Sequence, residues 1–391
     1  MRAMWTVALK EIKDNLRDRR ALTSSLLFGP LIGPLVMTLM LTTISQQAQE
    51  KAQAPLQLPI VGVEYAQNLV AFLKRQGVEV LAAPPNPEQA VRNKKYDVVL
   101  RIPEKYPQQW RSGEPASVEI ITDRSQQQAQ LSRNRLQALL SSYSQQTGSL
   151  RLYLRGIDPT IAQAVRTREM DLSTPDSQSA LVFGVLPFFV LMTVFIGGMY
   201  LAIDTTAGER ERQSLEPLLI TAVPRWQIMA GKLTATFCFC VLTLVVALLA
   251  FALSAQIISS NVDNIQPNLS PRVLLSCFAV VLPVALIASS LQTIIAAFSK
   301  GFREAQTYLS FLQLVPMVPG IWLMVSPLKE QFWMSWVPLL SQSVIINQLI
   351  KGETIELTWA LSCIASSALL GLLLAVVAAR LYSRPNLVFN S

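Results

Sequence analysis

Long runs of uncharged residues alternate with short charged segments along this chain. Six runs are long enough to consider as membrane spans: Leu22–Ile44, Ala180–Ile203, Leu233–Ile257, Val273–Phe298, Ala305–Ser326 and Thr358–Ala379. About 20 apolar residues in a helix cross the hydrocarbon core of a bilayer. The pattern therefore predicts an α-helical polytopic membrane protein with six transmembrane helices.

A seventh run, Phe332–Ile350, is interrupted by polar and aromatic residues and by Pro338. Those residues suit a re-entrant or interfacial hairpin better than a helix that faces lipid. The distribution of lysine and arginine also favours six spans. Outside the long insert, fourteen of these residues then fall on the N-terminal side of the membrane. Three, Arg272, Lys329 and Lys351, fall in the short outer connections. We therefore expect cytoplasmic N- and C-termini in a bacterial inner membrane.

This topology divides the chain into segments with distinct expected roles. The spans, completed by flanking residues, are 22–44, 180–203, 231–257, 273–298, 305–326 and 358–380. The remaining segments are a cytoplasmic amphipathic interface helix (1–21), an extracytoplasmic domain (45–179), a cytoplasmic loop (204–230), re-entrant outer helices (327–352) and a cytoplasmic tail (381–391).

The long insert between the first two spans has the mixed pattern of an α/β domain. Alternating apolar residues predict strands in LPIVGVEYA, VEVLAA, DVVLRIP and SVEIITD, with helices between them and a long helix over residues 126–153. No catalytic spacing and no glycine-rich phosphate loop occur in the insert. We expect this domain to bind or brace another molecule.

Composition removes several classes of chemistry. The chain is 51% hydrophobic and only 15% charged, and it contains no histidine, which excludes Ser-His-Asp hydrolases and zinc sites of the H-E-x-x-H type. The four cysteines lie inside apolar runs, where we interpret them as packing residues. Gly231-Lys232 is followed by Leu233 instead of Ser or Thr, so the chain has no Walker A loop. We expect no enzymatic activity, no metal and no bound cofactor.

The loop after the second span combines charges with an apolar face. Charged residues at the centre of a bilayer cost about 2.5 to 3.5 kcal/mol each, so Arg210, Glu211 and Arg212 must lie in water or in a protein groove. Thr206 and Glu209 have the spacing of a capping box, and Ser214 is placed to cap a second short helix. That helix would carry Glu216 and Pro217 in its first turn and an apolar face made of Leu215, Leu218, Leu219 and Ala222.

Two interpretations of this loop remain open. It is either a solvated loop whose leucines dip into the interface, or a docking helix for a soluble partner. The N-terminus raises a similar choice. Trp5, Leu9, Ile12 and Leu16 recur at helical spacing, with charged residues on the other faces. This pattern predicts an amphipathic helix on the inner leaflet, although any lead helix at that surface would look similar.

Three segments carry a resemblance to a known family: KEIKDNLRDRRAL before the first span, GERERQSLEPLLITAVPRWQIMAGK after the second, and SKGFREAQTYLSFLQLVPMVPG entering the fifth. They resemble permease subunits of type-2 ABC exporters, especially the sodium-extrusion subfamily with its large extracytoplasmic insert. The resemblance covers nearly the whole chain and is weakest in the insert and after Ser383.

The resemblance implies two sets of site residues. The stretch from Glu209 to Arg225 corresponds to the coupling helix that seats in a groove of a separate ATPase subunit, with the docking residues Glu209, Arg210, Glu211, Arg212, Ser214, Leu215, Glu216, Leu218, Leu219, Thr221 and Pro224. The stretch from Trp5 to Arg20 corresponds to the inner-surface helix beside it, with Trp5, Leu9, Lys10, Glu11, Ile12, Arg17, Asp18, Arg19 and Arg20.

The implied partners are an ABC ATPase subunit that binds ATP and Mg, a second permease subunit and membrane lipids, with no nucleic acid. None of the six apolar runs contains Asp, Glu, Lys or Arg, whereas ion pathways usually include such residues. An apolar or amphipathic substrate such as a lipid or drug-like molecule is therefore favoured over sodium. The alternative is a mechanotransmitter, in which the ATPase moves the outer domain and nothing is transported.

Overall fold

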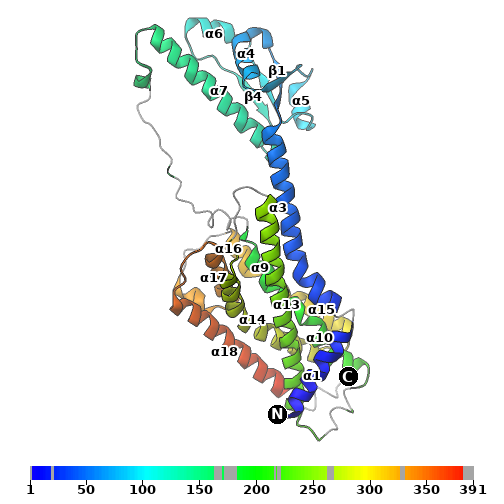
Figure 1. The fold of residues 1–391 in the computed structure, drawn as a ribbon. Helices are drawn as coiled ribbons and strands as arrows, with labels where there is room; N and C mark the ends of the chain where they lie inside the picture. Colours follow the sequence, from blue (N-terminus) through cyan, green and yellow to red (C-terminus); the bar gives the residue numbers. More distant parts are fainter. Residues whose placement is uncertain are drawn as a thin grey trace. The chain divides into compact units, whose positions relative to one another are not determined.

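The computed structural model describes residues 2–18, 22–162, 170, 183–214, 217, 222–261, 268–325 and 331–381. Two compact units divide the chain. Residues 1–45 and 172–391 form one unit, named here the membrane unit, and residues 46–171 form the other, the insert domain. Figure 1 shows that the described strands all belong to the insert domain.

The insert domain is an α/β unit with a four-stranded sheet in the order β2-β1-β3-β4. Its strands are β1 (Leu56–Val61), β2 (Val78–Leu81), β3 (Val98–Arg101) and β4 (Glu119–Thr122). β1 pairs in parallel with β2 and β3, and β4 runs antiparallel to β3. Branched apolar residues that alternate with polar ones favour strands. β2, β3 and β4 each lie within a segment where the sequence predicts a strand, whereas β1 begins two residues before the predicted segment LPIVGVEYA.

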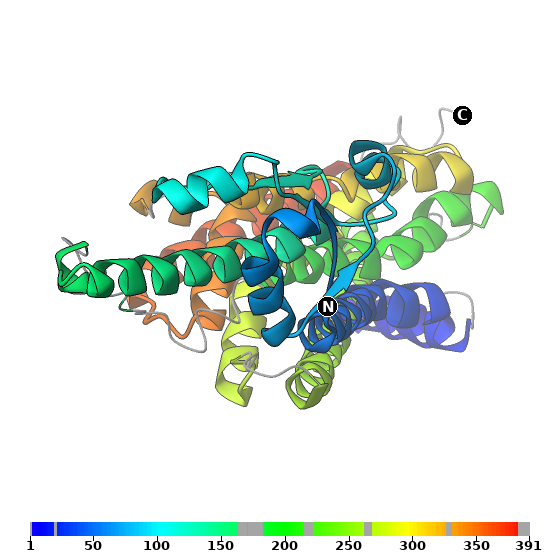
Figure 2. The same ribbon diagram turned by 90° about the horizontal axis from the view of Figure 1, so that it is seen from above.

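Helices pack against this sheet and bury its apolar residues. They are α4 (Gln67–Arg75), α5 (Pro87–Arg92), α6 (Tyr106–Ser112) and α7 (Gln127–Leu154), and α7 appears in Figure 2 as one long helix. Aromatic rings join three of them: Tyr143 on α7 lies 5.1 Å from Phe72 on α4 and 5.8 Å from Trp110 on α6, between ring centres. The core therefore lies between the sheet and these three helices.

Five helical segments among the described residues are long and apolar enough to cross a membrane: Ser25–Gln47, Leu186–Glu211, Arg225–Asn261, Pro271–Phe298 and Leu357–Leu381. The first comprises part of η1 (Thr23–Phe28, a π-helical turn) and part of α3 (Gly29–Gln53). The second comprises α9 (Leu186–Gly197), α10 (Met199–Ile203), η4 (Asp204–Gly208, also π-helical) and α11 (Glu209–Glu211). The others are α13 (Arg225–Asn261), α14 (Pro271–Phe298) and α18 (Leu357–Leu381). The protein is therefore mostly helical, as a polytopic membrane protein requires.

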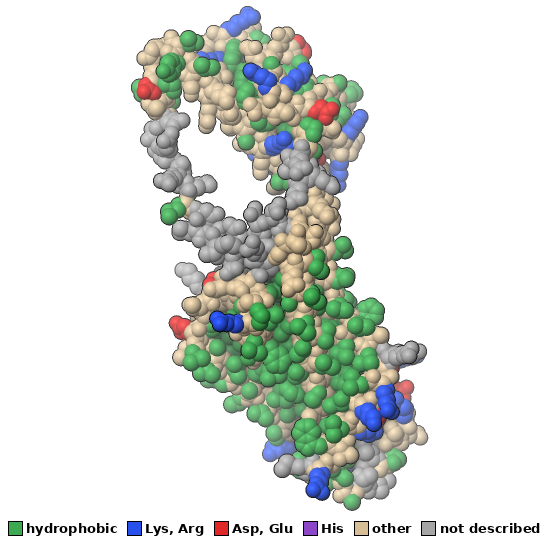
Figure 3. Space-filling model, viewed as in Figure 1, with side chains coloured by type: hydrophobic (Ala, Val, Ile, Leu, Met, Phe, Trp, Pro, Cys, Tyr) green, Lys and Arg blue, Asp and Glu red, His purple; other side chains and the backbone are tan. Residues whose placement is uncertain are grey.

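Apolar side chains fill the membrane unit and also cover its outside. Its largest core cluster joins residues of α9, α13, α14 and α17 (Leu340–Ile350). Exposed leucines such as Leu35, Leu249 and Leu372 lie on α3, α13 and α18. Figure 3 shows apolar side chains over this face of the membrane unit, with most of the lysines and arginines toward the lower end of it in this view. Such a surface fits a lipid environment.

The fifth predicted span differs from a single helix. Over residues 305–326 the structure has two shorter helices, α15 (Phe302–Leu312) and α16 (Met317–Val325), joined by a turn at 313–316. Pro316 accounts for the break, because proline lacks an N–H and disfavours helical geometry in the residue before it. The expectation of one continuous helix was wrong, and a membrane crossing by this pair stays a prediction.

The seventh apolar run forms η5 (Phe332–Trp336) and α17, which has 11 residues. A helix of that length is about half as long as a bilayer core is thick. Gln342 on α17 is fully buried, and its Nε2 donates a hydrogen bond of 2.7 Å to Ser367 Oγ on α18. The polar residues of this run are therefore packed against other helices, as a re-entrant segment requires.

The second spanning segment is offset where α9 ends and α10 begins. Gly198 lies there, and a Cβ atom at this position would come within 2.6 Å of Cys240 Sγ on α13 and 2.5 Å of Gln292 Oε1 on α14. Gln292 Nε2 donates a 2.6 Å hydrogen bond to the Phe195 carbonyl oxygen. Glycine is therefore required for this close approach of three helices.

Candidate functional site

The N-terminal helix α1 (Arg2–Arg17) packs on α13 with its small and polar face. Ala8, Glu11 and Asn15 are buried, whereas Trp5 and Leu9 are more than half exposed. Leu16 is also exposed, and Ile12 packs against the buried residues Leu201, Ala235 and Phe239. Most of the apolar stripe thus faces away from the membrane unit, where an inner-leaflet helix would contact lipid.

Close packing of α1 on α13 depends on Gly231. A Cβ atom at this position would lie 2.8 Å from the Met4 carbonyl oxygen and from Val7 Cβ.

Burial raises the pKa of the Glu11 carboxyl, and a 3.1 Å hydrogen bond from Lys10 Nζ opposes that rise. The helix therefore brings a poorly solvated carboxyl to the surface of α13.

The capping box predicted at Thr206 is absent from the structure. The second spanning segment continues without interruption through η4 and α11, so no helix begins at that point. Thr206 Oγ1 donates to the Ala202 carbonyl oxygen at 2.5 Å, and Thr205 Oγ1 donates to that of Leu201 at 2.8 Å. Hydroxyls inside a helix commonly bond to the carbonyl four residues earlier, and here the uninterrupted helix overrides the local capping pattern.

Glu209 forms an ion pair with Lys232 across the loop that follows the second spanning segment. The Lys232 side chain on α13 has no exposed surface, and its Nζ donates to Glu209 Oε2 and, at 2.5 Å, to the Thr205 carbonyl oxygen. Glu209 lies in α11 before the loop, and Lys232 lies inside α13 after it. This largely buried charge pair holds the two helices together, since losing either partner would leave the other buried and unpaired.

Arg210 binds the end of a different helix. Its guanidinium donates hydrogen bonds of 2.9 Å to the Ala297 carbonyl oxygen and 3.1 Å to that of Ser299. Both lie at the C-terminal end of α14, where backbone carbonyls lack partners within the helix. A cation at a helix C-terminus is also stabilised by the helix dipole.

Glu211 and Arg212 complete the group. Glu211 Oε2 accepts a 2.8 Å hydrogen bond from the backbone N–H of Phe302, the first residue of α15. Arg212 Nη2 lies 2.7 Å from Asp204 Oδ1 within the same helical segment. The four consecutive charges Glu209–Arg212 therefore contact α13, α14, α15 and their own helix in turn.

The apolar part of the predicted docking helix cannot be compared with the structure. Leu215, Glu216, Leu218, Leu219 and Thr221 lie outside the described residues, as do Arg19 and Arg20. Ser214 Oγ donates to the Glu209 carbonyl oxygen at 3.2 Å, and Pro224 directly precedes α13. ATPase docking by all of these residues stays a prediction, while Glu209–Arg212 have partners within this chain.

Lys232 is the residue that sequence reasoning missed. In the sequence it stands directly before the third apolar run, as one more positive charge on the expected inner side. The structure places it inside a continuous helix, and the second spanning segment likewise includes Asp204 and Glu209. The expectation of spans free of charge is therefore wrong near the helix ends that flank the loop between α11 and α13. The available signal was a lysine flanked by apolar residues seven positions after Arg225, which is helical spacing.

Comparison with known proteins identifies the family of this chain. A model of the family described as ABC-2 family transporter protein matches residues 24–377. The chain belongs to this family. Its relatives include the ABC transporter permease protein NatB of Bacillus subtilis (strain 168), 28% identical over 272 residues, which are 68% of this chain and 70% of the relative. Another is the probable multidrug ABC transporter permease YbhR of Escherichia coli (strain K12), 24% identical over 230 residues, 59% of each chain.

Membership confirms the family expected from the sequence. As an ABC-2 permease the chain is a multi-pass membrane subunit of an ABC transporter, and the family implies an ABC ATPase subunit as its partner. Permease subunits are typically not enzymes. Within the described residues no group of three or more His, Cys, Asp or Glu could hold a metal ion.

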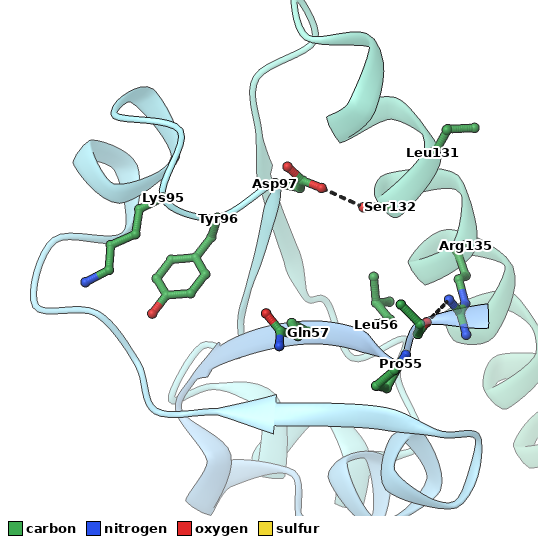
Figure 4. A pocket seen from close by; sticks show the side chains of 10 residues that line it. Pro55, Leu56, Gln57, Lys95, Tyr96, Asp97, Leu131, Ser132 and Arg135 are labelled. Atoms are coloured by element: carbon green, nitrogen blue, oxygen red, sulfur yellow. Dashed lines mark hydrogen bonds between the residues drawn. The ribbon is translucent and has the colours of Figure 1, made fainter. Parts of the chain in front are cut away.

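A second feature of this ABC-2 permease is a pocket of about 650 Å³ in the insert domain. Figure 4 shows it at the start of β1 and before β3, between the Tyr96 ring and α7. Arg135 Nη1 donates to the Ala54 carbonyl oxygen at 2.9 Å, and Ser132 Oγ donates to Asp97 Oδ2 at 3.0 Å. Its charged side chains are therefore engaged within this domain, and the Nζ of Lys95 lies over the Tyr96 ring, 5.7 Å from its centre.

Proposed function

We propose that this chain is the transmembrane subunit of an ABC exporter that moves an apolar or amphipathic molecule, such as a lipid or drug-like compound, out of the cytoplasm or the inner leaflet. Two permease subunits, identical or related, would enclose the pathway within membrane lipid. A separate ATPase subunit with ATP and Mg would supply the energy, and N- and C-termini would lie in the cytoplasm.

The observation that carries the proposed substrate class is the distribution of charge in the described spanning helices. Their acidic and basic side chains lie toward the helix ends, and Lys232 and Glu209 neutralise each other. Deeper polar groups such as Gln292, Thr243 and Ser289 are neutral and hydrogen-bonded within the chain. A sodium ion that sheds its water needs several hard oxygen ligands, usually with a carboxylate, so a neutral interior supports an apolar cargo.

One relative's name states a kind of cargo. It is called a probable multidrug ABC transporter permease, which fits the proposed cargo. Transport itself would follow from alternating access, in which closure of the ATPases pushes the loop after the second span and rotates the helices.

A mechanotransmitter is the second candidate, and one feature favours it. Helix α3 begins in the membrane unit and contributes its last residues to the insert domain, three residues before β1 starts. Movement of that helix would reach the insert domain without any cargo. A continuous pathway between two protomers supports export, whereas a sealed seam filled with bulky side chains supports the mechanotransmitter.

The test is transport into inverted vesicles that contain this permease and its ATPase. We expect ATP-dependent uptake of a fluorescent lipid or an amphipathic dye and no uptake of sodium-22 with proton and potassium gradients collapsed. Leu218→Asp should release the ATPase and abolish uptake without preventing membrane insertion. Sodium-22 accumulation that disappears in the Leu218 variant would contradict the proposed substrate class.

Orientation is tested separately by labelling single cysteines in a cysteine-free background. Cysteines replacing Ser112 and Ser260 should react with an impermeant thiol reagent added outside, and those replacing Ser214 and Ser391 should not. Labelling at position 391 from outside would mean that the 332–350 run crosses the membrane.

A further inference from the structure

We propose that Glu209, Arg210, Glu211 and Lys232 form a transmission clamp, a set of internal bonds through which a push on the cytoplasmic loop moves α13, α14 and α15 together. This inference rests on the proposed function, because it assigns a positioning role in ATP-driven transport. It concerns residues that bind within the chain, and it is independent of how the ATPase is recognised.

The first part of the clamp closes the loop on itself. Glu209 and Lys232 stand 23 positions apart, the first at the start of the segment predicted to dock the ATPase and the second inside α13 beyond its end. Lys232 also bonds to the Thr205 carbonyl oxygen, one turn before Glu209. A force on the loop therefore reaches the second and third spanning segments at one common point, and the loop cannot lengthen at one end while the other stays still.

The second part joins the next pair of helices. Arg210 holds the carbonyl oxygens of Ala297 and Ser299 at the end of α14, and Glu211 holds the N–H of Phe302 at the start of α15. Two neighbouring side chains thus span the short α14–α15 connection. Gly301 lies within it, and a Cβ atom there would come 3.2 Å from Glu211 Oε2, so glycine allows the carboxylate to approach the backbone.

The ion pair and hydrogen bonds of the clamp suit a role in coupling better than a role in stability. A buried ion pair loses in desolvation much of what it gains in attraction, and apolar side chains of similar volume often stabilise a fold equally well. Apolar packing is tolerant of sliding, whereas charge-assisted hydrogen bonds fix a direction and a distance. The clamp therefore suits the transfer of movement between helices.

The experiment compares the permease–ATPase complex carrying Lys232→Met with the wild type and with Lys300→Met, an exposed lysine on the same side of the chain. Three quantities are measured: ATPase bound after purification, ATP hydrolysis, and the ATP-dependent change in hydrogen exchange at the Phe302 amide. We expect Lys232→Met to keep the ATPase and hydrolyse ATP but to lose the change at Phe302, with transport reduced about tenfold or more, the size of common couplings between sites.

Charge exchange and a second site guard against misfolding. Glu209→Lys combined with Lys232→Glu re-forms the ion pair and should restore part of the change. Glu211→Ala, at an exposed position, removes the acceptor of the Phe302 N–H and should lose the change at Phe302 even if Lys232→Met does not fold. A normal response at Phe302 in both Lys232→Met and Glu211→Ala overturns the clamp, and so does a wild-type complex that shows no ATP-dependent change there.

The two proposals fail in different ways. If the clamp is right and export is wrong, the wild type still shows the ATP-dependent change at Phe302 but moves no lipid or dye. If export is right and the clamp is wrong, the variants transport and respond like the wild type.

Discussion

Charged residues have very different surroundings at the α11–α13 end of the membrane unit and in the insert domain. Lys232 is fully buried and bound to Glu209, whereas Arg101 on β3 pairs with Glu119 and Glu88 at distances of 3.2 and 3.4 Å in side chains that water reaches. Exposed pairs contribute little to stability, while a buried charge depends on its partner. The contribution of an ion pair to the stability of this protein therefore depends on its exposure to solvent, and a count of ion pairs does not measure it.

The largest effect is expected when one buried partner is removed. Glu209→Ala leaves Lys232 without its carboxylate in a dry site, and breaking such a pair costs about 3 to 5 kcal/mol. Thermal unfolding of the purified permease measures the loss. The double variant Glu209→Gln with Lys232→Met should recover most of it, because both charges are gone. Equal instability in the two variants would show that the pair's surroundings, and not its charge, set the stability.

A smaller effect is expected at the end of α14. Arg210→Lys keeps the positive charge but cannot reach two carbonyl oxygens with a planar fork, so it should lose about 1 to 3 kcal/mol. Thermal unfolding again measures the loss. Arg212→Lys, at an exposed arginine that pairs with Asp204, serves as the matched control. If both variants lose the same amount, the two carbonyl contacts have no special role.

The insert domain should be least sensitive to the loss of a charge pair. Arg101→Ala removes contacts with Glu88 and Glu119 and should cost less than about 1 kcal/mol, because these side chains are solvated. Raising the salt concentration should shrink the difference from the wild type further. A loss as large as that of Glu209→Ala would break the comparison between the two regions.

The pH dependence around Glu11 should be the smallest effect. Burial raises the pKa of this carboxyl in the folded chain, so the folded state binds its proton more tightly than the unfolded state does. Its favourable contribution is complete below the ordinary carboxyl pKa and is lost as the pH rises through the raised pKa. Glu11→Gln should therefore flatten the pH dependence of thermal stability above the ordinary carboxyl pKa. An unchanged curve would exclude Glu11 as its source.

Apolar runs predicted six spans, of which five are long helices among the described residues. Alternating residues predicted the strands. Both signals come from periodicity within one segment. Pro316 is visible in the sequence as a helix breaker, but the run around it is long enough for one span. The exposed stripe of Trp5 and Leu9 on α1 agrees with the predicted amphipathic pattern, because in lipid an apolar face need not turn toward other helices. The contacts of Arg210 were beyond prediction, since helix ends far apart in sequence supply its acceptors.

The close approach at Gly198 has a consequence for how this protein can evolve. Any new side chain there meets Thr236 and Cys240 on α13 and Gln292 on α14, so a substitution requires these neighbours to shift or to become smaller. An altered residue at 198 is therefore expected together with altered residues among 236, 240 and 292. The crossing would then be inherited as a block of four positions.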